Sequence, residues 1–81
     1  MQIELRKQAQ KYLDHVDMIT RRKLYRAIEK LSHWEGDIRP LKGLPNHYRC
    51  KIYHYRILFK LEMDRCVIVV IEINTRTNIK Y

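Results

Sequence analysis

The chain has 81 residues with a formal net charge of +8, and 46% of its residues are hydrophobic and 32% charged. This composition excludes an intrinsically disordered chain, and the length allows a single domain with a small core. The charge is uneven, because residues 1–37 carry 8 Lys and Arg against 6 Asp and Glu, whereas residues 38–81 carry 9 against 3. A positive field of this kind favours a polyanion or an acidic protein as the partner.

The N-terminus is charged from its start, and the longest apolar run, Cys66 to Ile71, is too short to cross a bilayer. We therefore predict a cytoplasmic protein that does not bind a membrane. In that compartment Cys50 and Cys66 are expected to be free thiols, both buried in a sheet. Two cysteines alone do not indicate a metal site, and we predict no cofactor.

The first half of the chain has helical periodicity after a short β-like start. Residues Gln2–Leu5 alternate apolar and polar side chains and predict a short strand. A helix is expected over Lys7–His15, and a second helix should follow, capped at its N-terminus by Asp17 or by Thr20. The buried stripe of the second helix comprises Leu24, Ala27, Ile28 and Leu31. Helices joined by so short a turn form a helical hairpin.

The second half of the chain changes to β periodicity. Residues Ser32–Asn46 contain both glycines and both prolines of the sequence and predict a loop. Strands are then expected at Tyr48–Ile52, Tyr55–Leu61 and Cys66–Ile73. Their short connections, Tyr53–His54 and Glu62–Arg65, favour an antiparallel meander, and the apolar third strand should be its central, doubly covered member. The predicted fold is α+β, with an N-terminal helical hairpin packed on one face of a small, twisted antiparallel sheet.

Basic residues lie within these strands as well as between them. Arg49 and Lys51 alternate with apolar residues, so both cations should share the sheet face that the helices leave uncovered. Arg56 in the next strand is expected on the same face, and Arg76 follows the third strand directly. Charge brought close to a core is costly unless it is paired. This pattern therefore indicates a surface that handles phosphate groups.

The order and spacing of these elements resemble the RelE/ParE superfamily of type II toxin–antitoxin toxins, and in particular its RelE-like branch. The resemblance covers essentially the whole chain. It rests on the helical hairpin, the segment Gly36-Asp37-Ile38-Arg39-Pro40-Leu41-Lys42-Gly43, Tyr48-Arg49-Cys50-Lys51, Tyr55-Arg56-Ile57, Arg76 and the terminal Tyr81. It implies the small α+β fold described above.

The resemblance also implies an activity and a set of partners. RelE-like toxins enter the ribosomal A site and cleave the mRNA codon there without a metal. The 2′-hydroxyl attacks the adjacent phosphate, which leaves a 2′,3′-cyclic phosphate and a 5′-hydroxyl. The expected partners are the ribosome, mRNA and a cognate antitoxin, whose acidic, amphipathic segment would cover the basic sheet face. DNA would be reached only through the antitoxin.

By motif position, the resemblance implies a catalytic role for five residues. Lys51 would be the general base, Arg76 the general acid or the stabiliser of the leaving group, and Arg49 and Arg56 the phosphate clamp, while Tyr81 would orient or stack on the RNA. The chemistry fits, because cleavage needs a base for the hydroxyl, cations for the developing charge and an acid for the leaving oxygen. Crowding by arginines favours the neutral amine that a lysine base needs. The planar guanidinium suits phosphate, and a tyrosine ring can stack on a base.

Further residues allow more than one interpretation. His47 is a candidate for binding the phosphate, and Arg21 and Arg22 are candidates for contacting ribosomal RNA. The same arginines could instead form a solvated helix face. Arg56 could tie strands together through Glu72 in place of binding RNA.

Alternative functions are a ParE-like toxin that inhibits DNA gyrase without catalysis, or an attenuated family member that mainly binds its antitoxin. Arg49, Lys51 and Arg76 argue against the gyrase alternative, because the ParE branch generally lacks this basic set. The attenuated alternative is favoured by Tyr53, which stands where the family often has Gly in the turn before Tyr-Arg. A tyrosine tolerates a positive φ poorly.

Overall fold

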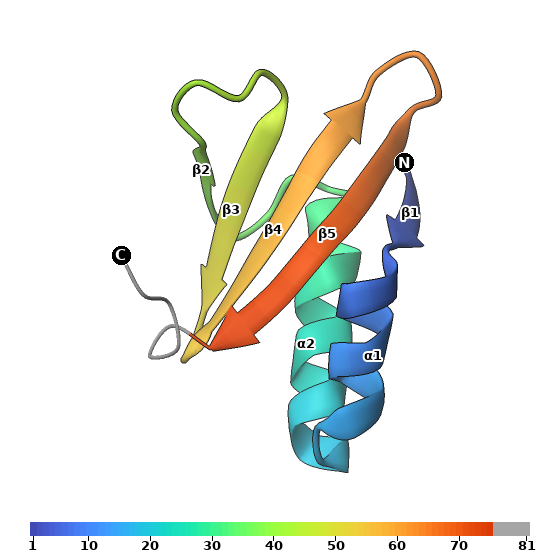
Figure 1. Cartoon of the computed structure of the whole chain (residues 1–81), viewed down its shortest axis with the longest axis vertical. Coiled ribbons are helices and arrows are strands. Elements are labelled where there is room, and N and C mark those ends of the chain that lie inside the picture. The colour runs from blue at the N-terminus through green and yellow to red at the C-terminus, as the bar shows by residue number, and fades with distance from the viewer. Residues whose placement is uncertain (76–81) are drawn as a thin grey trace.

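The computed structural model describes residues 1–75, in which two helices pack on one face of a five-stranded sheet (Figure 1). In chain order the elements are β1 (Gln2–Leu5), α1 (Lys7–His15), α2 (Met18–Leu31), β2 (Asp37–Pro40), β3 (His47–Ile52), β4 (Tyr55–Glu62) and β5 (Val67–Thr75). Across the sheet the strand order is β1-β5-β4-β3-β2. The predicted α+β class and the helical hairpin packed on a sheet are confirmed.

Asp17 caps the N-terminus of α2. Its carboxylate accepts hydrogen bonds from the backbone N–H groups of Ile19 and Thr20, each at 3.1 Å. Hydrogen bonds from the Thr20 side chain and from these backbone groups hold the pKa of Asp17 below its usual value. Of the two predicted caps, Asp17 is therefore the one used, and Thr20 lies in the first turn of the helix.

The sheet is mixed, whereas the prediction was purely antiparallel. Strands β2 to β5 pair antiparallel, but β1 lies parallel to β5, with Gln2 opposite Val67 and Leu5 opposite Val70. A parallel pair needs a long crossover, and here α1, α2 and the other strands provide it. Beyond β1, the Gln8 side chain accepts a bond from the N–H of Ile73 and donates one to its C=O, both at 2.9 Å. Gln8 thus continues the pairing of β5 where β1 has ended.

Strand β2 lies inside the segment that was predicted to be a loop. It is a short edge strand, and of its residues only Ile38 packs against the core. Pro40 lacks an N–H group, which an edge strand tolerates because one of its sides is unpaired. Gly36 precedes the strand with φ 125°, and a Cβ there would lie 3.2 Å from Cys50 Sγ. The strand therefore depends on a close approach to β3 that local propensity does not reveal.

The turns between the long strands contain residues other than glycine at positive φ. Tyr53, which stands where a glycine was expected, has φ 53° in the two-residue connection between Ile52 and Tyr55. The turn therefore forms with a tyrosine at this position. The Lys23 ammonium lies 4.9 Å from the centre of the Tyr53 ring. Cys66 also has φ 53° and lies in the turn before β5, exposed to solvent. The prediction that Cys66 is a buried strand residue was wrong, because the turn takes up that position; Cys50 is buried as predicted.

Strand β5 is an interior strand, but it lies second from the sheet edge, and β4 occupies the middle of the order. Both of its faces are buried at the start, as predicted: Ile68 and Val70 belong to the core under the helices, while Val67 and Val69 point to the other face. There, charged side chains on either side of β5 cover the valines. This edge ion-pair cluster consists of Glu4, Lys60, Glu62 and Arg65.

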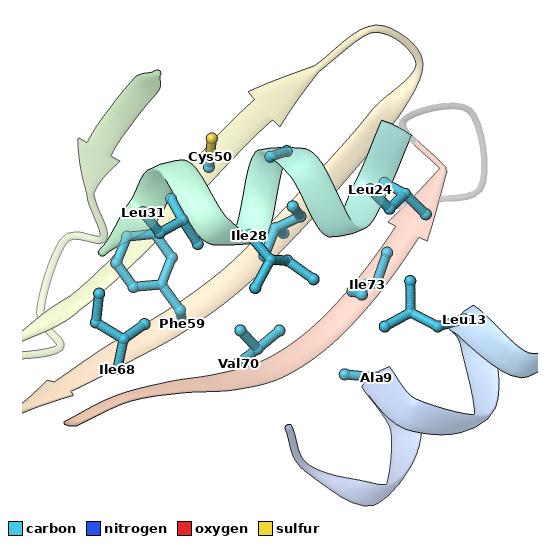
Figure 2. Packing of buried hydrophobic residues seen from close by; sticks show 12 residues of the cluster. Ala9, Leu13, Leu24, Ile28, Leu31, Cys50, Phe59, Ile68, Val70 and Ile73 are labelled. Carbon is cyan, nitrogen blue, oxygen red and sulfur yellow. The ribbon is translucent and has the colours of Figure 1, made fainter. Parts of the chain in front are cut away.

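The core lies between α2 and the sheet (Figure 2). Leu24, Ile28 and Leu31 of α2 point toward the strands, as their spacing predicts. The largest fully buried side chain is Phe59 of β4, in the part of the chain that the structure describes. Trp34 packs edge-on against Tyr48 and Phe59, so it covers the junction between helix and loop.

Candidate phosphate-binding face

The sheet face opposite to the helices, called here the open face, carries the basic residues. The pairing register brings Lys51 of β3 opposite Arg56 of β4. Arg49 lies two residues from Lys51 on β3 and therefore points the same way. Cys50, between these two cations, points into the core, where burial raises the pKa of its thiol. The alternation places Arg49, Lys51 and Arg56 on one face.

Lys51 and Arg56 are half-buried, and the Nε atom of Arg56 is fully buried. Arg56 lies opposite Asn74 on β5, and Glu72 lies opposite Leu58, one row further along the open face. Glu72 is thus a diagonal neighbour of Arg56. The partial burial holds both cations close to the sheet surface, where screening by water is weaker than on an exposed loop.

Arg39 is a basic residue of this face that sequence reasoning did not single out as a site residue. It lies opposite Arg49, and Asp37 of the same strand lies opposite Lys51. Arg39 Nε is 3.5 Å from Asp37 Oδ1, and both side chains are more than half exposed. The alternation of Asp37, Ile38 and Arg39, with only the middle residue apolar, was the available signal, but the neighbouring Gly and Pro residues concealed it.

His47 lies at the far end of β3, on the open face, opposite Lys60. Its Nδ1 atom is 2.8 Å from the carbonyl oxygen of Pro45. Arg49 is two positions further along the strand, which corresponds to about 7 Å. His47 therefore borders the group of cations and does not lie within it.

Arg21 and Arg22 lie on α2, in the layer behind the sheet (Figure 1). The Arg21 guanidinium donates to the carbonyl oxygens of Leu13, Asp14 and Val16, at 2.7 to 3.2 Å. Arg21 therefore binds the C-terminal end of α1 and links the helices of the hairpin. Arg22 is exposed. The fold does not bring these residues together with the cations of the open face.

The remaining predicted site residues, Arg76 and Tyr81, lie outside the described residues. Strand β5 extends to Thr75, which is opposite Tyr55 at the end of β4. The same end of the sheet carries Lys51 and Arg56.

Charge divides the open face into two parts. At the end of the sheet where β4 turns into β5, Arg65 contacts Glu4 at 3.1 Å and Glu62 Oε2 at 2.7 Å, and Lys60 Nζ lies 3.4 Å from Glu62. The Arg65 hydrogen bond holds the pKa of Glu62 below its usual value, and bonds to both carboxylates raise the pKa of Arg65. Charge is balanced within this cluster. The excess of positive charge lies over β2, β3 and the Tyr55 end of β4.

In residues 1–75 there is no group of three or more His, Cys, Asp or Glu side chains that could hold a metal ion. The helices of the same segment are all too short or too polar to span a membrane.

Residues 1–75 form a helical hairpin on a five-stranded sheet, and the sheet face that the helices leave uncovered carries an excess of positive charge. This arrangement defines the structural class of the protein. No family profile and no curated protein matches the chain. Solved structures do. The isolated RelE toxin of E. coli superposes with a TM-score of 0.78 at 19% identity, over 91% of this chain and 82% of that one. The chain therefore has the fold of the RelE toxins.

Two archaeal structures show the same likeness. RelE in the RelE–RelB complex of Pyrococcus horikoshii has a TM-score of 0.76 at 19% identity, over 96% of this chain and 97% of that one. The RelB–RelE antitoxin–toxin complex of Methanococcus jannaschii gives a TM-score of 0.73 at 25% identity, over 91% of each chain. In both cases the likeness extends over nearly the full length of the two chains.

Proposed function

We propose that this chain is the toxin of a type II toxin–antitoxin system and an endoribonuclease that cleaves mRNA codons in the ribosomal A site. The observation that carries the proposal is the group formed by Arg49, Lys51 and Arg56 on the open face of a RelE fold. A fold is used for many functions, so the argument depends on this group and not on the likeness alone.

In the proposed mechanism, Lys51 removes the proton from a 2′-hydroxyl, and the resulting oxygen attacks the adjacent phosphorus. Arg49 and Arg56 stabilise the negative charge that develops on the phosphate oxygens. As the bond between phosphorus and the 5′ oxygen breaks, Arg76 donates a proton to this oxygen or stabilises its negative charge while water protonates it, and Tyr81 orients or stacks on the RNA. The products are a 2′,3′-cyclic phosphate and a 5′-hydroxyl, and neither a metal nor another cofactor takes part.

The geometry supports these roles in two ways. Lys51 lies directly opposite Arg56, and facing residues of neighbouring strands have Cβ atoms about 5 Å apart. An amine and a guanidinium at that separation can reach one phosphodiester together. Arg56, whose Nε is buried, has less freedom than a surface arginine and loses less of it on binding phosphate.

Induced expression of the chain in bacteria, followed by primer extension on cellular mRNA, tests the function. We expect growth arrest and new 5′ ends inside translated codons. Purified chain should then cleave the same mRNA when ribosomes are added. Growth arrest without new 5′ ends, together with loss of gyrase supercoiling activity, would instead establish the ParE-like alternative, which the structures named above do not support.

We also propose that a cognate antitoxin covers the basic half of the open face, which contains Arg49, Lys51 and Arg56. The antitoxin would do so with an acidic, amphipathic segment. The similar archaeal structures are complexes of RelE with RelB. In this chain the excess of positive charge over β2 to β4 is complementary to an acidic segment. Hydrogen exchange on the complex purified from its native operon should show protection in β3 and β4. Protection confined to α1 and α2 would contradict this interface.

A further inference from the structure

We propose that Arg39 is a further phosphate-binding residue, which extends the RNA-binding surface from β4 across β3 to the edge strand β2. The inference deepens the proposed function and rests on it. Arg39 is placed on the open face by its register opposite Arg49, and Ile38, its neighbour, packs against the core. The two arginines and Lys51 thus form the basic half of the face together with Arg56.

A charged residue on an edge strand discourages pairing with another chain, but that role does not require it to face a second arginine. Like charges directly opposite each other on neighbouring strands are destabilising. Arg39 faces Arg49 in this way. Unfavourable placements of charge are retained where binding requires them. The pair therefore indicates a surface that is completed by an anion lying between the two guanidinium groups.

The contact between Arg39 and Asp37 leaves the guanidinium available. The two atoms are 3.5 Å apart, and the side chains are 67% and 52% exposed. An exposed ion pair of this kind is worth little, so a phosphate can displace the carboxylate at small cost. Asp37 acts as a competitor that occupies Arg39 when no RNA is bound.

The position of Arg39 also defines a direction for the RNA. Neighbouring strands lie about 4.8 Å apart, so the cations of β2, β3 and β4 span about 10 Å across the sheet. This length matches one phosphodiester and part of the next nucleotide. On the side of β5, the row that holds Arg39 and Arg49 continues through Leu58 to Glu72, whose carboxylate repels a polyanion. The chain of the RNA therefore leaves the group around Lys51 toward β2, where Arg39 contacts the flanking phosphate.

Binding of a single-stranded RNA oligonucleotide with 2′-O-methyl groups tests this proposal, because the blocked hydroxyls prevent cleavage. Fluorescence anisotropy would be measured over a range of salt concentrations. Arg39→Gln should weaken binding about five- to tenfold, and the slope of log affinity against log salt should fall by about 0.7. Asp37→Asn should tighten binding about two- to threefold, since it removes the competing carboxylate.

Matched controls on the helical layer separate a local contact from a change in net charge. Lys11→Gln and Glu29→Gln alter the charge by the same amount at exposed positions of α1 and α2, and both should bind within about twofold of wild type. The melting temperature of Arg39→Gln should equal or exceed that of wild type, because a repulsive pair is lost. A purely structural role for Arg39 would instead lower it.

The outcomes are distinguishable. If wild type binds the oligonucleotide and Arg39→Gln binds equally with the same salt slope, the proposal for Arg39 is overturned while the nuclease can stand. If Arg39→Gln weakens binding but wild type fails to cleave ribosome-bound mRNA, Arg39 is a phosphate contact and the proposed nuclease fails. If wild type shows no salt-dependent binding, both proposals are wrong.

Discussion

Replacing Lys51 with Ala is expected to reduce mRNA cleavage at least about 100-fold, because a general base contributes on the order of 10²–10⁴ to a rate. The substitution removes the amine that the register holds opposite Arg56. The loss should appear in kcat measured with ribosomes and saturating mRNA, since the base acts in the chemical step. Expression of this variant should no longer arrest growth.

A second substitution at the same position separates proton transfer from simple attraction of the phosphate. Lys51→Arg keeps the positive charge, but a guanidinium stays protonated and cannot accept a proton. This variant should bind the blocked oligonucleotide about as well as wild type and yet cleave as poorly as Lys51→Ala. Lys11→Ala, on the exposed surface of α1, is the control and should leave cleavage unchanged.

Full activity in Lys51→Arg would remove Lys51 from the role of base and leave it as part of the phosphate clamp. Full activity in Lys51→Ala would eliminate the proposed site altogether. Melting temperatures accompany both measurements, and we expect them to lie within a few degrees of wild type. A large fall would mean that lost folding, and not lost chemistry, explains the inactivity.

Phe59→Ala is expected to cause the largest loss of stability, about 3–5 kcal/mol in the free energy of unfolding. Phe59 is fully buried, stacks on Tyr48 with ring centres 5.6 Å apart and meets Trp34 edge-on. Figure 2 shows it under Leu31 of α2. A chain of this length is stable by only about 4–12 kcal/mol, so the variant should be largely unfolded or melt far below wild type.

Thermal unfolding followed by circular dichroism measures this effect. Phe59→Leu fills most of the same volume and should lose much less stability. Leu44→Ala changes an exposed side chain and should leave the melting temperature almost unchanged. A melting temperature for Phe59→Ala close to wild type would mean that the helices and the sheet do not depend on this aromatic cluster.

The composition of the candidate site was predictable only in part. The alternation around Cys50 was sufficient to place Arg49 and Lys51 on one face, because successive side chains of a strand point to opposite sides. The alternation does not identify the partner of Lys51, which follows instead from the two-residue connection Tyr53–His54, because the length of that turn sets the register between β3 and β4. Arg76 and Tyr81 lie outside the described residues, and their roles stay predictions.

For Arg21, the sequence pattern suggested a role that differs from the contacts in the structure. Its place in a cluster of basic residues suggested contact with RNA, but its guanidinium binds three carbonyl oxygens at the end of α1. The end of a helix leaves such carbonyls without partners inside the helix. Only the way in which α1 and α2 meet decides that this arginine, and not Arg22, supplies the missing donors.

The sequence by itself determined those features that arise from residues close together along the chain. The 3.6-residue spacing of Leu24, Ile28 and Leu31 predicted α2 and its buried side, and the carboxylate of Asp17 predicted its first turn. These features depend on local backbone geometry and on which side of a helix or strand must be buried.

Only the tertiary structure decided which distant segments pair. It placed β1 parallel to β5 and formed β2 from a segment that contains Pro40 and follows Gly36. It also brought Arg39 opposite Arg49, which creates the basic half of the open face. The physical reason is that a short edge strand has too few residues for a pattern of its own. Its hydrogen bonds and its register are supplied by the neighbouring strand, so its structure follows from the completed sheet.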